Sequence, residues 1–147
     1  MSTIVLCSSA AFYEHVNQVA AKLEKLGFTA VVPKTARRMA ESGDYDVSHY
    51  KTWYEDANDY HKKAELMRAH FDEVAKGDAI LVINDEKHGI AGYIGSNVLM
   101  EMGLAFHLHK QIYVLHSVTT ESPVYEEVQG MGSVILDDDL TKISAEN

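Results

Sequence analysis

The chain has 147 residues, of which 46% are hydrophobic and 24% are charged, and its formal charge is −9 at pH 7. This length and composition are those of one ordinary globular domain and exclude a largely disordered chain. The negative charge disfavours DNA or RNA as a partner, because nucleic-acid-binding proteins need positive charge to contact phosphates. We therefore expect a single domain over residues 1–147 that binds no nucleic-acid polymer.

Neither a membrane segment nor an internal disulfide is expected. No stretch approaches the roughly 20 apolar residues that cross a bilayer, and the first residues lack the pattern of a secretion signal. Cys7 is the only cysteine, so a reducing compartment is the simplest fit. The sequence thus predicts a cytoplasmic protein with no membrane partner.

The first 33 residues predict two strands joined by a helix. The apolar run at residues 3–7 indicates a buried strand. Apolar residues then recur at helical spacing over residues 16–26, and Gly27 stands where helices commonly end. A second strand is expected at residues 28–32, closed by Pro33. A strand, a helix and a strand in this order predict parallel pairing through a right-handed crossover.

The middle of the chain is less regular. The apolar period is lost from residue 34 to about residue 61, and a long helix is expected after it, ending at Gly77. One face of this helix is predicted to be apolar, and its residues are Ala64, Met67, Phe71, Val74 and Ala75. The strand predicted at residues 79–83 is apolar throughout, which indicates a central position covered on both faces.

The last third predicts a loop at residues 84–97, followed by a helix with Ser96 or Asn97 as its N-cap. A strand is expected at residues 112–115, a short helix at 124–129 and an edge strand at 134–136. These elements together predict an α/β fold. We expect a single doubly wound domain, flavodoxin-like or Rossmann-like, with a mainly parallel sheet of about five strands flanked by helices.

In such a fold, ligands bind beyond the carboxyl ends of the strands. The candidate residues follow the predicted strands or lie in the glycine-rich turn, and they are Cys7, Ser8, Ser9, Asn84, Tyr93, Gly95, Ser96 and Asn97. The glycines of the turn would let the backbone approach a ligand closely, and the helix after it would direct N–H groups toward an anion. This rim is therefore the predicted binding site.

Glu101 is the candidate catalytic residue. It lies in the otherwise apolar run of residues 98–106, where an unpaired charge is costly to bury, so a functional role is indicated. Glu101 is four residues from Asn97, so both lie on one helix face. The alternative is simple charge complementarity at the start of a helix.

Three sequence features resemble one known family. They are a first strand that ends in a small-residue turn followed by Phe12 and Tyr13, the pair Gly77-Asp78 before an apolar strand, and the block at residues 101–106. In this block the family has Glu, any residue, Gly, any residue, Ala. The chain thereby resembles the nucleoside 2-deoxyribosyltransferase superfamily, including 2′-deoxynucleoside 5′-phosphate N-hydrolase-like proteins. Residues 90–115 resemble an uncharacterised bacterial and archaeal subgroup.

The resemblance implies cleavage or transfer at the N-glycosidic bond of a (deoxy)nucleoside or its 5′-phosphate. Glu101 would attack the sugar and form a glycosyl-enzyme intermediate. His70 stands where family members use an acidic residue to assist the leaving base, and its ordinary pKa near 6.5 would suit acid or base catalysis. The resemblance also implies that Phe12 and Tyr13 join the substrate site and that the protein is a homodimer or larger. No cofactor is expected.

Other interpretations stay open. One is a nucleotide-binding or sensing module of the same fold that has lost turnover, and another is a flavodoxin-like flavin site. The aromatic group at Tyr45, Tyr50, Trp53 and Tyr54 would either contact a ligand or form an interaction surface. No metal site is expected, because His107 and His109 are two residues apart and do not share a helix face.

Overall fold

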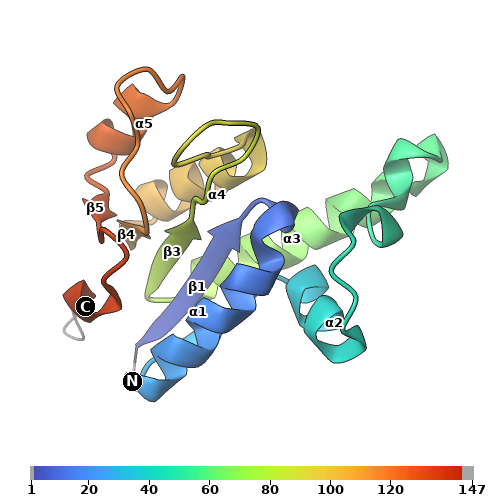
Figure 1. Cartoon of the computed structure of the whole chain (residues 1–147), viewed down its shortest axis with the longest axis horizontal. Coiled ribbons are helices and arrows are strands. Elements are labelled where there is room, and N and C mark those ends of the chain that lie inside the picture. Colours follow the sequence, from blue (N-terminus) through green and yellow to red (C-terminus); the bar gives the residue numbers. More distant parts are fainter. Residues whose placement is uncertain (1, 144–147) are drawn as a thin grey trace.

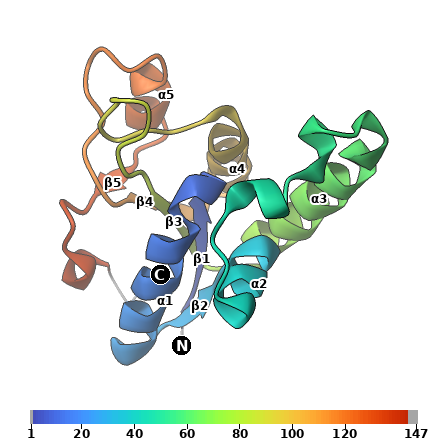
Figure 2. The same cartoon turned by 45° about the vertical axis from the view of Figure 1, so that its right-hand side comes forward.

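Five parallel strands form one sheet in the order β2-β1-β3-β4-β5 (Figures 1 and 2). The computed structural model describes residues 2–143. The strands are β1 (Thr3–Ser8), β2 (Thr29–Val31), β3 (Ala79–Ile83), β4 (Gln111–Val114) and β5 (Val134–Ile135). The predicted α/β class, with a parallel sheet of about five strands flanked by helices, is confirmed.

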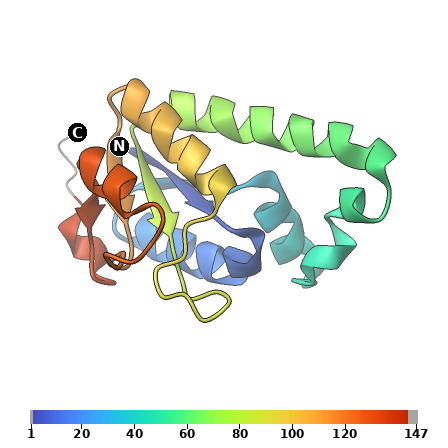
Figure 3. The same ribbon diagram turned by 90° about the horizontal axis from the view of Figure 1, so that it is seen from above.

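Helices cover both faces of the sheet (Figure 3). The longer helices are α1 (Tyr13–Lys25), α2 (Lys34–Ser42), α3 (Tyr60–Lys76), α4 (Ser96–His107) and α5 (Tyr125–Gly130). Because side chains alternate along a strand, Ile4 and Leu6 of β1 pack with α1, whereas Val5 and Cys7 pack with residues of α3 and α4. Every residue of β3 is buried, because helices cover both faces of the sheet (Figure 3). No helix within residues 2–143 is long and apolar enough to cross a membrane.

The strand order reverses direction between β1 and β3. β1 leads into α1 on one face, whereas β3 leads through a loop into α4 on the other face. Where neighbouring strands diverge in this way, the loops after them separate and leave room for a ligand. The carboxyl ends of β1 and β3 are thus the part of the fold that can form a site.

Element boundaries follow the predictions closely where local signals are strong. Gly27 ends α1 with a φ of 96°, a conformation that favours glycine. The strand predicted at residues 112–115 and the helix predicted at 124–129 are each displaced by one residue. The predicted N-cap of α4 is wrong, because Gly95 holds that position and Ser96 begins the helix without a side-chain cap.

Two helical features were not predicted. The first is α2, which buries only a short stripe of Thr35, Ala36 and Met39. So short a stripe leaves no apolar period in the sequence. In α3, the buried residues are His70 and Val74, whereas Ala64 and Ala75 are not buried. The N-terminal half of α3 extends beyond the sheet (Figure 2), so its apolar residues have no sheet to cover.

Candidate functional site

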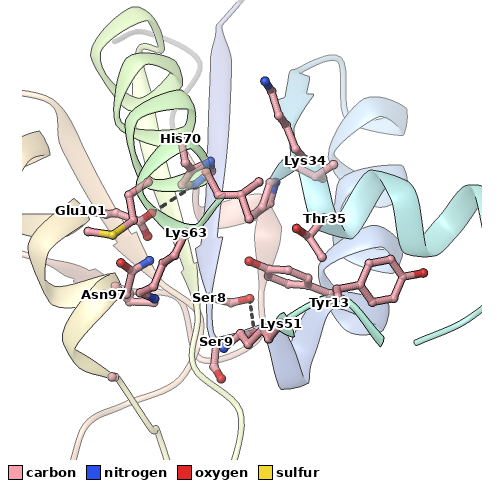
Figure 4. Close-up of a pocket in the computed structure, with 18 of the residues that line it drawn as sticks. Ser8, Ser9, Tyr13, Lys34, Thr35, Lys51, Lys63, His70, Asn97 and Glu101 are labelled. Atoms are coloured by element: carbon pink, nitrogen blue, oxygen red, sulfur yellow. Dashed lines mark hydrogen bonds and ion pairs between the residues drawn. The ribbon is translucent and has the colours of Figure 1, made fainter. Parts of the chain in front are cut away.

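A cavity of about 290 Å³ lies beyond the carboxyl ends of β1 and β2 (Figure 4). Ser8, Ser9 and Pro33, at or just after the ends of these strands, form part of its wall. The N-terminal ends of α2 and α4 and the inner side of α3 form the rest. The cavity therefore occupies the rim of the sheet at which the sequence predicts a ligand.

Most of the predicted site residues lie on the wall of this cavity. They are Ser8, Ser9, Tyr13, Tyr93, Gly95, Ser96 and Asn97, together with His70 and Glu101. Three predicted residues are placed elsewhere. Phe12 is packed in the core with α1, and both polar atoms of the Asn84 amide are bonded to the backbone of His116 at 2.8 Å. Cys7 is fully buried behind the wall. That the wall residues bind a ligand stays a prediction.

Glu101 extends from α4 into the floor of the cavity, and only 3% of its side chain is exposed. Burial penalises the charged carboxylate and raises the pKa of Glu101 to about 8, which a hydrogen bond with Cys7 only partly offsets. The carboxyl group is therefore largely protonated at neutral pH when nothing else is bound.

His70 faces Glu101 from α3. Its Nε2 atom lies 3.7 Å from Glu101 Oε2 and 3.6 Å from Cys7 Sγ. Burial lowers the pKa of His70 to about 4, although a hydrogen bond to the backbone of Leu6 opposes this change. The ring is therefore uncharged near neutral pH and cannot titrate there, contrary to the expectation from its ordinary pKa.

Two further ionisable groups lie close to Glu101, Tyr13 on the cavity wall and Cys7 behind it. Burial raises the pKa of the Cys7 thiol well above its usual range, and the charge of Glu101 adds to the effect. Burial likewise raises the pKa of the Tyr13 hydroxyl. These two groups, like His70 and Glu101, are thus neutral at pH 7 in the unliganded protein.

Positive side chains line the cavity, and no sequence pattern predicted them there. They are Lys34, Arg37, Lys51, Lys63 and Lys87. The carboxylates on the wall, among the described residues, are those of Glu73 and Glu101. A signal existed for two of these cations, because Lys34 and Lys87 follow β2 and β3 closely and so belong to the rim that also holds Pro33 and Asn84.

Aromatic rings hold three of these lysines in place. Lys51 Nζ lies 6.0 Å from the ring centre of Tyr54, and Lys63 Nζ lies 5.5 Å from that of Trp53. Lys87 Nζ lies 5.2 Å from the ring centre of Tyr93. These contacts have the geometry of cation–π interactions, which position a charge without neutralising it. Part of the aromatic group therefore faces the cavity.

Asn97 has an unsatisfied acceptor at the cavity. Its Oδ1 atom is buried and has no hydrogen-bond partner in the described part of the chain. Because Gly95 takes the N-cap position, Asn97 lies inside the first turn of α4, and its side chain is one of those on the wall. A buried acceptor without a partner is costly, so a ligand with a hydroxyl or N–H donor would be stabilised here.

Comparison with solved structures gives only weak likenesses. No family model matches the chain, and no curated protein matches it. Among solved structures, FerB, a flavoenzyme NAD(P)H:(acceptor) oxidoreductase from Paracoccus denitrificans, matches with 14% sequence identity and a TM-score of 0.44. The match covers 100% of this chain and 78% of FerB. A likeness this distant transfers neither a cofactor nor an activity.

These findings overturn the predicted family. No family model and no curated protein matches the chain, so neither comparison supports the resemblance to the nucleoside 2-deoxyribosyltransferase superfamily. The function that depended on it, N-glycosidic cleavage or transfer, is withdrawn together with its nucleotide-sensing alternative.

Proposed function

We propose that the cavity binds a small phosphorylated molecule, with its phosphate between Lys51, Lys63 and Lys87. The observation that carries this proposal is the convergence of these lysines from three separate segments on one cavity. Partial burial and then the charges of Lys63 and Lys87 lower the pKa of Lys51. A bound anion would relieve this repulsion.

The lysines remain available to a ligand. Within residues 2–143, the lysines in ion pairs are Lys62 and Lys142, which contact Asp59 and Asp137. Lys87 donates to the Ser9 hydroxyl at 2.8 Å, a contact that leaves its charge uncompensated. Unpaired positive charge in a protein of net charge −9 creates a local field that attracts anions.

Two helix ends support the same ligand class. The N-termini of α2 and α4 both reach the cavity, through Thr35 on one side and Ser96 and Asn97 on the other. Free backbone N–H groups at a helix N-terminus favour phosphate. The lysines and the helix N-termini therefore both favour a negatively charged ligand.

The rest of the cavity wall suits an uncharged organic group. Tyr13, Trp53 and Met67 provide apolar surface, and the unpaired Oδ1 atom of Asn97 provides an acceptor. A volume of about 290 Å³ is near the lower limit of known small-molecule sites, which begin at roughly 300 Å³. A sugar phosphate has this size and this combination of polar and charged groups.

The single tryptophan makes this proposal testable by fluorescence. Trp53 lies on the cavity wall, so its emission reports binding. We would titrate the protein, in the presence of a chelator, with ribose 5-phosphate, glucose 6-phosphate, flavin mononucleotide and inorganic phosphate. Ribose, glucose and riboflavin are the unphosphorylated controls. We expect saturable binding of a phosphorylated compound at least about tenfold tighter than its control, and weakening with salt.

Neighbouring lysines provide matched variants. Lys63→Gln should weaken binding about tenfold or more, because a charge-assisted hydrogen bond contributes about 1.5–3 kcal/mol. Lys62→Gln removes the same charge one residue away, from a side chain paired with Asp59 and off the cavity wall, and should leave binding unchanged. Equal affinity for phosphorylated and unphosphorylated compounds, or equal effects of the two variants, would refute the proposal.

The expected cytoplasmic location and homo-oligomer remain predictions. Exposed apolar side chains on α4, Met100 and Phe106, are available for contact with a second copy. Sedimentation of the purified protein would measure the assembly directly.

A further inference from the structure

Three potential metal ligands converge below the cavity floor, each from a different element. Cys7 is on β1, His70 on α3 and Glu101 on α4, and all three are buried. Their ligand atoms lie within 4.8 Å of one another. We propose that Cys7 Sγ, His70 Nε2 and a Glu101 carboxylate oxygen bind one divalent transition-metal ion of the Zn²⁺ type, whose fourth position faces the cavity.

The spacing of the ligand atoms fits a tetrahedral ion. Zn–S bonds of about 2.3 Å and Zn–N or Zn–O bonds of about 2.0–2.1 Å place neighbouring ligand atoms roughly 3.3–3.6 Å apart. His70 Nε2 lies 3.6 Å from Cys7 Sγ and 3.7 Å from Glu101 Oε2. Only small side-chain movements would bring all three atoms to bonding distance of one ion.

Other histidine–carboxylate pairs in this protein behave differently. His15 and His116 approach Asp85 at 2.6 and 3.1 Å, which are hydrogen-bond distances. The separation of 3.7 Å between His70 and Glu101 is too long for such a bond. These two groups therefore lie around a common point and do not bond directly to each other.

The donor set and its surroundings are those of a zinc site. Thiolate, imidazole and carboxylate are the three ligand types that Zn²⁺ prefers. The His70 ring also hydrogen-bonds to the backbone of Leu6, and such a bond fixes the orientation of a metal-binding imidazole. One thiolate and one carboxylate would balance the two charges of the ion, so the buried site would be neutral.

The position of the cluster leaves one side of the ion accessible. His70 and Glu101 are on the cavity wall, whereas Cys7 lies behind it. An ion held by these three residues would therefore have its remaining coordination position open to water or a ligand in the cavity. Three protein ligands and one open position are the arrangement of catalytic zinc sites. The ion would not require the proposed phosphate ligand, because its ligands are protein atoms.

Cobalt titration tests the site in the unaltered protein. The full chain, without a histidine tag, would be stripped with chelator, freed of the chelator and titrated with Co²⁺. We expect one equivalent to bind, with the visible bands of four-coordinate cobalt and a thiolate-to-cobalt charge-transfer band in the near ultraviolet. Cys7 is the only cysteine, so this band would identify the site without any substitution. Zn²⁺ should displace the cobalt and raise the melting temperature.

Variants then assign the other ligands. Cys7→Ala should abolish the charge-transfer band, and His70→Ala and Glu101→Gln should each weaken Co²⁺ binding about tenfold to a hundredfold. His107→Ala, which removes an exposed imidazole at the end of α4, should have no effect. Absence of the charge-transfer band in wild-type protein at saturating Co²⁺ overturns the proposal, even if a buried variant fails to fold. Unchanged affinity in folded His70→Ala or Glu101→Gln also overturns it. Neither outcome affects the phosphate titrations, which contain chelator.

Discussion

Gly92 lies so close to the main chain of Ser117 that a β-carbon at Gly92 would overlap the Ser117 carbonyl oxygen. Gly92 also has a φ of 67°, which side chains other than glycine adopt rarely. This contact joins the loop before α4 to the segment after β4. Because the same loop carries Tyr93 and Gly95 to the cavity wall, the site depends on a position that only glycine can fill.

The first prediction follows from this contact. Gly92→Ala should lower the free energy of unfolding by about 2–3 kcal/mol, since backbone strain and steric overlap add. Gly89→Ala is the matched control, because Gly89 has a similar φ of 76° but a β-carbon there would meet nothing within 4 Å. It should cost about 1 kcal/mol. Urea denaturation measures both, and equal losses would show that the Ser117 contact is unimportant.

A second pair of glycines should have opposite effects. A β-carbon at Gly77 would lie 2.6 Å from Cγ2 of Val5, which is fully buried in the sheet. Gly77→Ala should therefore destabilise the protein by about 1–3 kcal/mol through overpacking. Gly103 lies in α4 with open space around it, so Gly103→Ala should stabilise by about 0.5–1 kcal/mol. Thermal melting would decide, and effects of the same sign would contradict this prediction.

Asp85 connects two elements at the rim of the sheet. One carboxylate oxygen lies 2.6 Å from His15 Nδ1 on α1, and the other lies 3.1 Å from His116 Nε2 after β4. Asp85→Ala should lower the free energy of unfolding by about 1–3 kcal/mol, because both rings lose a charge-assisted or polar partner. Glu86→Ala, at the exposed neighbouring position, should change it by less than about 0.5 kcal/mol. Similar losses in the two variants would show that Asp85 contributes no specific stabilisation.

The pH behaviour of His49 provides a test at the surface. A hydrogen bond and the charge of Asp44, and then the charge of Asp46, raise the pKa of His49 above its ordinary 6.5. A raised folded-state pKa means that protonated His49 favours the folded state. This contribution is fully present below pH 6.5 and is lost as the pH rises through the folded-state pKa. Asp44→Asn should lower the His49 pKa in an NMR titration.

Asp139→Asn is the control for this titration. Asp139 caps the short helix Leu140–Lys142, a segment on the opposite side of the molecule from α2 (Figure 1). It should leave the His49 pKa unchanged. A His49 pKa at or below 6.5 in the wild-type protein would contradict the assigned contact with Asp44.

Cys7 and His70 show why the sequence did not reveal the proposed metal site. The two residues are 63 positions apart, and their side chains approach only because α3 packs on the face of the sheet to which Cys7 points. The apolar pattern of α3 also does not include His70 in its buried face. A periodicity of apolar residues predicts the face that covers a sheet, whereas α3 extends past the sheet (Figure 2) and buries the polar ring of His70 beside Cys7 of β1.

The lysines at the cavity show the same limit. Nothing local distinguishes Lys63, which faces the cavity, from Lys62, which pairs with Asp59. The direction of each side chain follows from the rotation of α3 against the sheet, and packing sets that rotation. The charge of −9 disfavours a nucleic-acid partner, but this total conceals a local concentration of positive charge.

The sequence alone determined the α/β class, the apolar strands and the glycine that ends α1, because these depend on hydrophobic periodicity and on backbone conformations that few residues adopt. It also located the rim at which a cavity forms, since parallel strands present their carboxyl ends together. Only the tertiary structure decided which side chains meet there and in what charge state. Those properties arise from the packing of β1, α3 and α4. The apolar run around Glu101 indicated a costly burial, but the burial that lowers the pKa of His70 comes from distant elements and has no local signature.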